Sequence, residues 1–511
     1  MSSTSSGGYS FTALLADEAA TRRLMLDIAA LIEPGDLITL SGDLGAGKST
    51  FARAFIRAAA GDETIEVPSP TFTLMQSYDL PPYRLLHADL YRIGNAEELA
   101  ELGFDELRDG AVTLLEWPDR AETLLPQDRL DVALTLAPEK GPTVRHARVT
   151  GYGVFAARAE RMARIRAFLA ANGFAQASRK RIQGDASTRS YERLTREGTS
   201  YILMNSPRRP DGPPMRDGKP YSAIAHLAES VTPFIAVARG LTERGFSAPQ
   251  IFAADREAGL IVLEDLGHDL VVSGDPPAPI EERYGAAIDV LAALHGMELP
   301  DLLPVEPGLD YQLPGYDMQA LLIEAELLLD WYLPKFNATI SGAGRDKFLD
   351  VWHDALTPAL EAPASWVLRD YHSPNLLWLP QREGAACVGL LDFQDAVMGP
   401  AAYDVASLLQ DARVDVPEAL EIALLTRYSR VRHAADPSFD AKHFAQLYAT
   451  MAAQRATKIL GIFARLEKRD HKPQYLRHMP RVWAYLRRAL AHPALETLQS
   501  WYRVHVPALR T

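Results

Sequence analysis

The chain has 511 residues, of which 47% are hydrophobic and 23% are charged, and its formal net charge is −13. This length exceeds what one hydrophobic core usually serves, so we expect two or three domains of roughly 100–200 residues each. The acidic balance argues against a broad nucleic-acid surface, and no apolar run approaches the roughly 18 residues of a membrane helix. Because the amino-terminal residues lack a secretory signal pattern, we expect a soluble, cytoplasmic protein.

Strand-like and helical runs alternate along the first part of the chain. The sequence predicts a helix at 50–60 and apolar strands at 37–41, 83–89, 112–116 and 130–137. This alternation is typical of an α/β fold with a largely parallel sheet. An amphipathic helix at 156–173 follows, so we place a domain boundary near residue 155, which divides the chain into domains 1–155 and 156–511.

The segment SGDLGAGKST at 41–50 fits the phosphate-binding loop pattern, and a predicted strand enters it while a predicted helix leaves it. Glycines let backbone N–H groups turn toward phosphate oxygens, Lys48 can reach the β- and γ-phosphates, and Ser49 offers a hydroxyl to Mg²⁺. We therefore predict ATP and Mg²⁺ as cofactors. The expected nucleotide contacts are Gly42, Gly45, Gly47, Lys48, Ser49 and Thr50.

Two acidic residues end apolar strands, Asp89 and Glu116. The carboxyl ends of parallel strands open onto the ligand crevice, so both carboxylates should face the phosphate-binding loop. There a carboxylate can hold Mg²⁺ or orient an attacking water, and the sequence does not divide these catalytic and metal-binding roles between them. His87 precedes Asp89 on the same strand face and suits packing beside the site as well as a direct role.

These residues carry a resemblance to a known family. The segments GDLGAGKST, PSPTFTL, HADLYR, ELGFDEL and LLEWPDR, between residues 42 and 120, together resemble the TsaE family of ATPases. The resemblance implies ATP hydrolysis that supports TsaB and TsaD in forming threonylcarbamoyladenosine at position 37 of tRNA, with tRNA contacted indirectly. It also makes Thr71 a candidate switch-loop residue near the γ-phosphate.

A second phosphate-handling motif, LRDYHSPNLL, lies at 368–377. Asp370 and Asn375 have the spacing of the protein-kinase catalytic loop, in which the aspartate accepts the proton of the acceptor hydroxyl and the asparagine binds Mg²⁺. The following residues read as a hairpin that should bring Asp392, at the end of its second strand, beside Asn375. We predict a second Mg²⁺ site there. After residue 400 the pattern is almost entirely helical.

Two segments before this motif suit nucleotide binding. The sequence GDASTRSYERL at 184–194 predicts a hairpin that covers phosphates, with Gly184, Ser187 and Arg189 as contacts, and IVLEDLG at 261–267 predicts an adenine-binding hinge that includes Glu264. Kinases usually present a lysine in the strand where this chain has Met204, so Arg189 is the candidate for neutralising phosphate charge.

The second half of the chain resembles the aminoglycoside phosphotransferase family, and within it the AmgK cell-wall sugar kinases. GDASTRSYERL, LRDYHSPNLL, the segment at 390–409 and the helical segment at 454–486 carry the resemblance. It implies an α+β, bilobal, protein-kinase-like fold and phosphorylation of N-acetylmuramate or N-acetylglucosamine at the anomeric hydroxyl, in peptidoglycan recycling. Arg455, Lys458 and Arg465 could meet an acidic sugar or form a solvated basic face.

Two alternatives remain open at this point. The C-terminal domain could phosphorylate an aminoglycoside or choline on the same fold. The N-terminal domain could act mainly as an ATP-gated binding module in the tRNA-modifying assembly.

Overall fold

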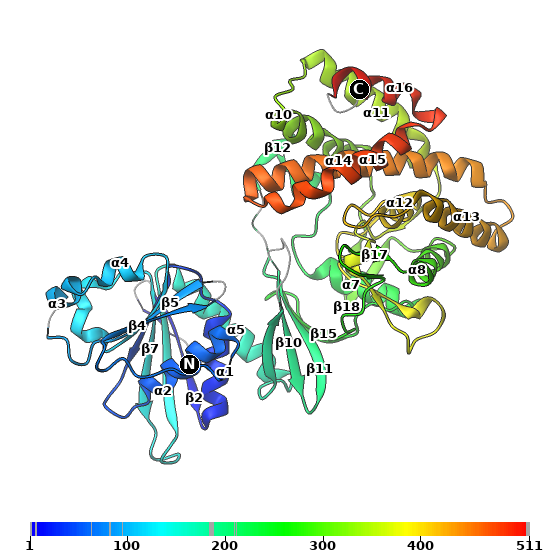
Figure 1. Cartoon of the computed structure of the whole chain (residues 1–511). Helices are drawn as coiled ribbons and strands as arrows, with labels where there is room; N and C mark the ends of the chain where they lie inside the picture. Colours follow the sequence, from blue (N-terminus) through cyan, green and yellow to red (C-terminus); the bar gives the residue numbers. More distant parts are fainter. Residues whose placement is uncertain are drawn as a thin grey trace. The chain divides into compact units, whose positions relative to one another are not determined.

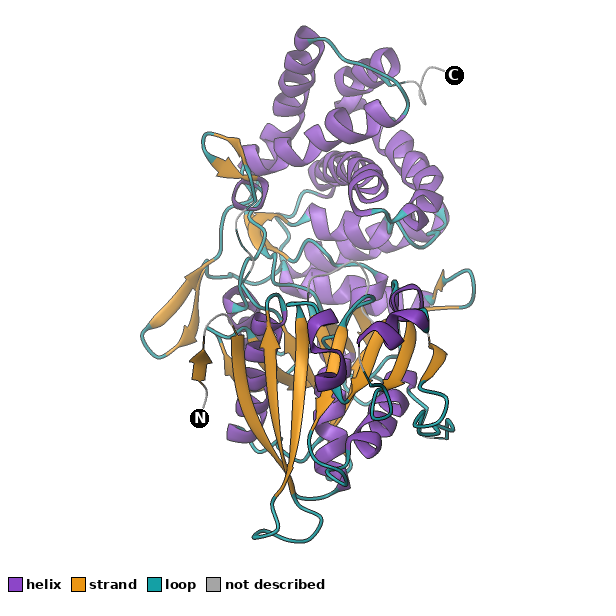
Figure 2. Ribbon diagram, turned by 90° about the vertical axis from the view of Figure 1, so that its left-hand side faces the viewer, coloured by secondary structure: helices purple, strands orange, loops and turns teal. Residues whose placement is uncertain are grey.

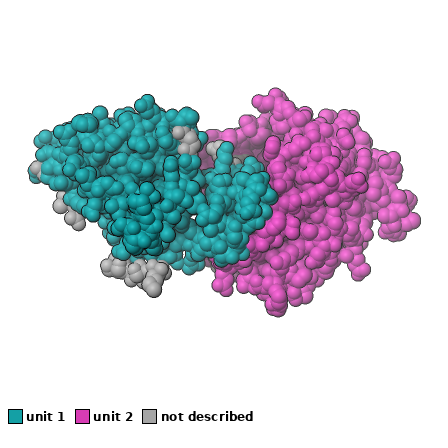
Figure 3. Space-filling view, turned by 90° about the horizontal axis from the view of Figure 1, so that it is seen from below, with its two compact units in different colours: residues 1–204 teal, residues 205–511 magenta. Residues whose placement is uncertain are grey.

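The computed structural model describes residues 3–5, 8–62, 64–80, 83–94, 96–182, 189–208, 210 and 212–506. The chain divides into two compact units, Met1–Met204 and Asn205–Thr511 (Figure 3). The predicted domain boundary near residue 155 stays a prediction, because this division falls later in the chain. Within the described ranges, no helix combines the length and the apolar character needed to cross a bilayer.

An eight-stranded sheet forms the centre of the first unit. Its order is β1-β2-β8-β7-β3-β6-β5-β4. The predicted parallel sheet is its middle, where β3 pairs in parallel with β7 and β6, and β6 with β5; the outer pairs are antiparallel. The strands are β1 (Ser3–Ser5), β2 (Gly8–Leu15), β3 (Leu37–Ser41), β4 (Met75–Leu80), β5 (Tyr83–Asp89), β6 (Val112–Glu116), β7 (Arg129–Leu136) and β8 (Arg145–Tyr152).

Helices cover both faces of this sheet (Figure 1). Successive side chains of a strand point to opposite faces, and β3 shows this directly. Ile38 and Leu40 join the core built with α1 (Glu18–Ala29), α2 (Lys48–Ala60) and α5 (Phe155–Ala171). Leu37 joins the other core, built with α3 (Ala96–Glu101), α4 (Phe104–Arg108) and the short helix η1 (Pro118–Leu124). Because both faces are buried, the central strands are largely apolar, as in other parallel sheets.

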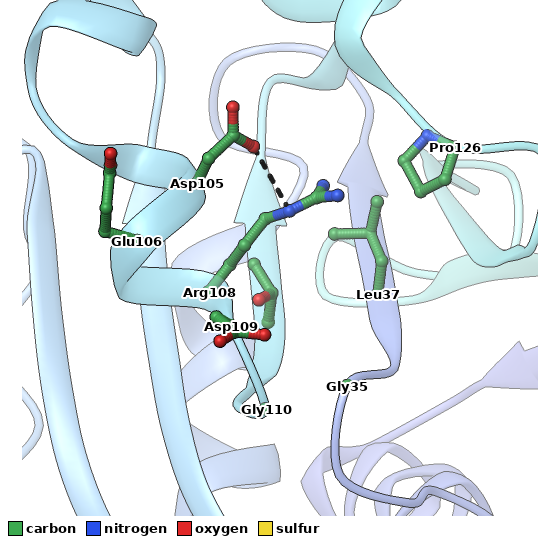
Figure 4. Close-up of a pocket in the computed structure, with 9 residues that line it drawn as sticks. Gly35, Leu37, Asp105, Glu106, Arg108, Asp109, Gly110 and Pro126 are labelled. Carbon is green, nitrogen blue, oxygen red and sulfur yellow. Dashed lines mark ion pairs between the residues drawn. The ribbon is translucent and has the colours of Figure 1, made fainter.

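A surface cleft of about 530 Å³ lies at the amino ends of β3 and β6 (Figure 4). Leu37 and Thr113 lie at its wall, and Arg108 pairs with Asp105 of the same helix, α4, at 3.3 Å. The phosphate-binding loop leaves the carboxyl end of β3. The cleft is therefore at the edge of the sheet opposite to that loop.

Five strands form a second sheet in the order β14-β15-β11-β10-β9. β9 pairs antiparallel with β10, and β14 with β15, as expected for successive hairpins. The strands are β9 (Ser178–Ile182), β10 (Ser190–Arg196), β11 (Thr199–Asn205), β14 (Ile251–Asp255) and β15 (Leu260–Glu264). The second unit adds two-stranded pairs, β12 (Pro214–Arg216) with β13 (Lys219–Pro220), β16 (Val272–Ser273) with β17 (Ala278–Pro279), β18 (Leu302–Glu306) with β19 (Leu309–Gln312), β20 (Ala364–Val367) with β23 (Val397–Pro400), and β21 (Leu376–Trp378) with β22 (Val388–Leu390).

Helices dominate the second unit (Figure 2). The prediction that the chain is mainly helical after residue 400 is confirmed. The longer helices are α7 (Thr232–Glu243), α8 (Glu281–Leu294), α9 (Met318–Leu327), α11 (Gly342–Glu361), α12 (Ala402–Leu409), α13 (Glu418–Ala435), α14 (Ala441–Asp470), α15 (Met479–Leu490) and α16 (Glu496–His505), with shorter turns α6 (Tyr221–Ile224), η2 (Leu328–Tyr332), α10 (Leu333–Lys335), η3 (Ser373–Asn375), η4 (Gly384–Cys387), η5 (Pro473–His478) and η6 (Pro493–Leu495).

The longest helix, α14, has identifiable start and stop signals. Asp440 caps its first turn by accepting hydrogen bonds from the backbone N–H groups of Lys442 and His443. His471 ends it in the left-handed conformation, with φ at 53°. Midway, Gly461 lies against Leu327, and a Cβ at this glycine would meet the Leu327 carbonyl carbon at 2.4 Å. Helix packing at this point therefore depends on the missing side chain.

Gly461→Ala is expected to destabilise the second unit by about 1–3 kcal/mol, because the added methyl has no room and the backbone must shift. Alanine is otherwise favoured over glycine within a helix by about 1 kcal/mol, so the clash has to outweigh that gain. Gly342→Ala at the start of α11 is the matched control, since nothing lies within 4 Å of its Cβ position. Urea unfolding should shift to lower concentration for the first variant alone; equal midpoints would contradict the packing argument.

Candidate active sites

The phosphate-binding loop joins β3 to α2 with a left-handed backbone that requires glycine. Gly42 has φ at 132°, and a Cβ there would lie 2.3 Å from the Leu134 carbonyl oxygen. Gly47 caps the start of α2 with φ at 101°. Both conformations are open to glycine and strained for other residues. The predicted loop is therefore present, with its backbone N–H groups at the amino end of a helix, where anions bind.

Lys48 is held at the loop by three contacts. Its ammonium donates to the carbonyl oxygens of Gly42 at 2.7 Å and Asp43 at 3.0 Å, and it lies 3.5 Å from the centre of the Trp117 ring. Burial lowers the pKa of Lys48, against the opposing charges of Glu116 and Asp89. The positive charge of Lys48 therefore lies at the phosphate-binding loop, beside the carboxylates that the sequence predicts there.

The two strand-end carboxylates lie side by side, because Asp89 pairs with Glu116 in the register of β5 and β6. Glu116 accepts from the Ser49 hydroxyl at 3.0 Å and contacts His87 Nε2 at 3.0 Å. Thr71 donates to Asp89 at 2.8 Å. The structure therefore gathers these predicted residues around the loop. A hydroxyl and carboxylate oxygens are the ligands that Mg²⁺ prefers, so Ser49 and Glu116 fit that ion.

The remaining loop positions differ in exposure, and one neighbour was not predicted. Gly45 and Thr50 are exposed. Arg145 of β8 donates from Nε to the Ala46 carbonyl oxygen at 2.6 Å, and the same nitrogen lies 2.9 Å from the Cβ position of Gly47. It brings a guanidinium to the loop from a strand almost 100 residues away in sequence, and no local pattern marks it.

In the second unit, the catalytic-loop motif forms a tight, hydrogen-bonded turn. Asn375 donates from Nδ2 to the Asp370 carbonyl oxygen at 2.9 Å, and the backbone N–H of His372 donates to the same oxygen at 3.0 Å. The Asp370 side chain is 41% exposed, and His372 Nε2 lies 3.7 Å from its Oδ1. Burial alone would raise the pKa of Asp370, but hydrogen bonding with His372 and the charges of Lys458 and Arg455 hold it below its ordinary value. Asp370 is therefore an accessible, ionised carboxylate.

Two buried aspartates that the motif does not include anchor this loop. Asp404 of α12 accepts from the backbone N–H groups of Leu368 at 2.6 Å and Arg369 at 2.9 Å. Asp411 accepts from the backbone N–H of Ser373 at 2.9 Å and from its hydroxyl at 2.5 Å. Together they fix the backbone on both sides of Asp370, with Leu368 occupying the position of the histidine in the usual kinase motif.

Stability is expected to depend on pH through Asp404. Burial raises the pKa of this carboxyl from 3.8 to about 7 in the folded chain. Between pH 3.8 and about 7 the unfolded chain has released the Asp404 proton while the folded chain keeps it. The contribution of Asp404 to the free energy of unfolding is therefore complete below the unfolded pKa and is lost as pH rises through the folded pKa. Asp404→Asn should remove this pH dependence of the urea midpoint. It should also cost about 1–3 kcal/mol, because one buried N–H loses its acceptor. An unchanged pH profile would contradict this role.

The predicted metal ligands Asn375 and Asp392 lie at neighbouring ends of the β21–β22 hairpin. Leu376 pairs with Leu390, and the Leu391 backbone N–H donates to the Asn375 carbonyl oxygen at 2.9 Å. Each ligand lies just outside its strand, since Asn375 ends η3 and Asp392 has a left-handed φ of 57°. Their side-chain oxygens fit Mg²⁺, and the metal role stays a prediction.

A buried ionic cluster contacts the catalytic loop through Arg369. Glu324 of α9 pairs with Arg369 and with Lys458, whose Nζ lies 2.7 Å from Oε1, and it accepts from the Tyr316 hydroxyl at 2.6 Å. Burial alone would raise the pKa of Glu324, but the two cations lower it below its ordinary value. Arg369 is the residue just before Asp370, so this cluster also positions the Asp370 carboxylate.

The structure describes only some of the nucleotide contacts predicted for the hairpin at 184–194 and the hinge at 261–267. Gly184 and Ser187 lie outside the described residues. Arg189 is described, half-buried and interacting with neighbours, and its role stays a prediction. The Glu264 carboxylate pairs with Arg382 and accepts from the Gln250 backbone N–H at 3.3 Å. The role of Glu264 in an adenine-binding hinge stays a prediction.

Comparison with known proteins finds relatives of both parts. Residues 15–145 match the family model of the threonylcarbamoyl adenosine biosynthesis protein TsaE, and residues 178–441 match that of the phosphotransferase enzyme family. An N-acetylmuramate/N-acetylglucosamine kinase of Caulobacter vibrioides is 42% identical over 362 residues, covering 68% of this chain and 97% of the relative. A kinase of the same name from Pseudomonas aeruginosa is 33% identical, covering 60% of this chain and 82% of its own. A TsaE protein of Rickettsia bellii is 39% identical over 123 residues, covering 24% of this chain and 85% of the relative.

Both resemblances predicted from the sequence are thereby confirmed, as are the two fold classes. Each match contains its motif, the phosphate-binding loop in one and the catalytic loop in the other. The chain belongs to both families, and it is a TsaE-family P-loop ATPase joined to a kinase of the phosphotransferase enzyme family.

Proposed function

We propose that the C-terminal part transfers the γ-phosphoryl group of ATP to the anomeric hydroxyl of N-acetylmuramate and N-acetylglucosamine, in peptidoglycan recycling. The observation that carries this proposal is the exposed, ionised Asp370 on a loop fixed by Asp404 and Asp411. The names of the curated relatives support the choice of sugars. A carboxylate of low pKa is a weak base and accepts a proton most readily from an acidic hydroxyl. The anomeric hydroxyl is the most acidic one of a reducing sugar, which supports it as the phosphoryl acceptor.

In this mechanism Asp370 accepts the proton of the anomeric hydroxyl while the sugar oxygen forms a bond to the γ-phosphorus. The bond from that phosphorus to the β,γ-bridging oxygen breaks at the same time, and ADP leaves. Asn375 and Asp392 would hold Mg²⁺, which neutralises charge on the phosphates when bound. His372 and the cluster behind the loop keep Asp370 ionised and in place.

Product analysis tests this proposal. The protein is incubated with ATP and each sugar, and phosphorus-coupled NMR locates the phosphate. We expect a sugar 1-phosphate from both acceptors. Phosphate on another hydroxyl would contradict the position, and no transfer to either sugar by a folded protein would contradict the sugar-kinase function and favour an aminoglycoside or choline acceptor, which are tested in parallel.

We also propose that the N-terminal part hydrolyses ATP in support of TsaB and TsaD during threonylcarbamoyladenosine synthesis, contacting tRNA only through them. The gathering of Lys48, Ser49, Glu116, Asp89 and Thr71 around one loop supports hydrolysis. The names of the TsaE relatives support the pathway. Both activities use ATP and act on cytoplasmic substrates, so the proposed location is the cytoplasm.

Reconstitution tests this second proposal. The chain replaces TsaE in a mixture of TsaB, TsaD, tRNA, ATP and the threonylcarbamoyl donor, and modified nucleoside is measured by mass spectrometry. Multiple turnovers are expected only with the chain present. A yield that is the same without it would contradict the proposed role.

A further inference from the structure

The cation Arg455 of α14 is buried and forms no salt bridge with a residue that the structure describes. It is 6% exposed, and its Nε has no hydrogen-bond partner. Across the residues that the structure describes, no carboxylate lies within ion-pair distance of its guanidinium, and the ring of Tyr403 at 5.9 Å is its recorded contact. Burying a charge is costly unless it is paired, so a buried guanidinium without a salt bridge indicates that an anionic ligand binds beside it.

Of the neighbouring cations, Lys458 and Arg369 pair with a carboxylate, whereas the buried Nε of Arg465 also lacks a hydrogen-bond partner. Lys458 is one turn further along the same helix, and it is used by Glu324 at 2.7 Å and by the Tyr403 hydroxyl at 3.3 Å. Arg369 is also paired with Glu324. Arg465 lies almost three turns beyond Arg455, roughly 15 Å at about 1.5 Å per residue, and it lies over the Tyr221 ring. The three basic residues therefore do not act as one face, because Lys458 pairs with Glu324 and Arg465 lies far along α14 from Arg455.

Arg455 is next to the catalytic loop through α12. Tyr403 presents its ring to Arg455, and the adjacent Asp404 accepts the backbone N–H groups that precede Asp370. The charge of Arg455 acts on both carboxyls: it helps to lower the pKa of Asp370, and it opposes the rise that burial causes in the pKa of Asp404. An anion bound by Arg455 would therefore be close to the acceptor hydroxyl that Asp370 deprotonates.

We propose that Arg455 binds the carboxylate of an acidic acceptor sugar and so distinguishes N-acetylmuramate, whose lactyl ether ends in a carboxylate, from N-acetylglucosamine, which has none. This inference rests on the proposed sugar-kinase function. A guanidinium suits the role because its planar donors match a carboxylate in two parallel hydrogen bonds. No bond is made or broken by Arg455 in this role.

The test compares wild-type protein and Arg455→Gln with three acceptors, N-acetylmuramate, its carboxyl methyl ester and N-acetylglucosamine. For N-acetylmuramate, the variant is expected to lose roughly 10- to 100-fold in kcat/KM, mainly through KM, as for a lost hydrogen bond to a charged group. The ester should cause a similar loss with wild-type protein. Combining variant and ester should add little, because both changes remove the same contact. Phosphorylation of N-acetylglucosamine should fall much less, because with this acceptor Arg455 acts only through its charge near Asp370.

Arg455→Lys keeps a charge without the paired donors, so it should restore part of the N-acetylmuramate activity even if Arg455→Gln folds poorly. Arg469→Gln is the matched control on the same helix, since Arg469 is exposed and pairs with the adjacent Asp470 at 2.8 Å. Equal losses for both sugars would overturn the proposal and assign the charge to the transferred phosphoryl group. Additive losses from variant and ester would overturn it as well. Failure of the wild-type protein to phosphorylate either sugar would instead overturn the proposed function on which it rests.

Discussion

Replacing Asp370 by asparagine is expected to lower kcat for sugar phosphorylation by about 10²–10⁴, the usual contribution of a positioned general base. Asparagine has nearly the same shape, so the loop bonds to the Asp370 backbone should remain, including that from Asn375 at 2.9 Å. What disappears is the ionised carboxylate, which His372, Lys458 and Arg455 keep charged. KM for the sugar should change little, because proton acceptance matters most in the transition state.

The measurement is steady-state transfer from ATP to N-acetylglucosamine, with far-ultraviolet circular dichroism to verify folding. N-acetylglucosamine is the acceptor for this purpose because it carries no carboxylate. Lys48→Ala serves as the control, because its motif belongs to the other family match. A kcat for Asp370→Asn within a few-fold of wild type would exclude Asp370 as the base.

Lys48→Ala is expected to reduce ATP hydrolysis by the N-terminal part by roughly 10²–10³, comparable to removing one preorganised electrostatic group from an active site. The ammonium is positioned by the Gly42 and Asp43 carbonyl oxygens and the Trp117 ring, at the loop that Ser49 and Glu116 also line. Alanine keeps the helix start and removes only this charge. The loop should thus keep its backbone and lose its stabilisation of phosphate charge.

Hydrolysis is best measured in the Asp370→Asn background, so that ATP use by the kinase part is small. Lys140→Ala, at an exposed position after β7, controls for loss of a lysine from the same unit. Unchanged hydrolysis in Lys48→Ala would contradict the assignment of the loop. Loss of hydrolysis with binding to TsaB and TsaD and tRNA modification both intact would favour the ATP-gated binding module over the hydrolytic role.

The local motifs and the elements around them follow from the sequence alone. The phosphate-binding loop at 41–50 occupies the predicted turn between β3 and α2, and the catalytic loop precedes the predicted β21–β22 hairpin. These features are local because the residues that form them are adjacent in the chain, so glycine positions, apolar runs and motif spacing determine them directly. The convergence of Asp89 and Glu116 also followed, since parallel strands end at one edge.

The sequence did not predict the contacts that complete each site, because their partners are far apart in the chain. Arg145 reaches Ala46 from β8, and Asp404 holds the backbone before Asp370 from α12. Glu264 likewise pairs with Arg382, which lies more than 100 residues away in the chain, and its place in an adenine-binding hinge stays a prediction. Spacing along the chain does not encode which distant side chains become neighbours.

The basic residues of α14 show this division most clearly. Their sequence spacing placed Arg455 and Lys458 on related positions of one helix, and it left open whether they face solvent or a ligand. Tertiary packing buried Arg455 and partly buried Lys458, and it paired Glu324 with Lys458 while leaving Arg455 without a salt bridge to a described carboxylate. The sequence determined the charges, and the packing of α9 and α12 against α14 decided which of them remains for a ligand, because pairing depends on distances that only the folded chain sets.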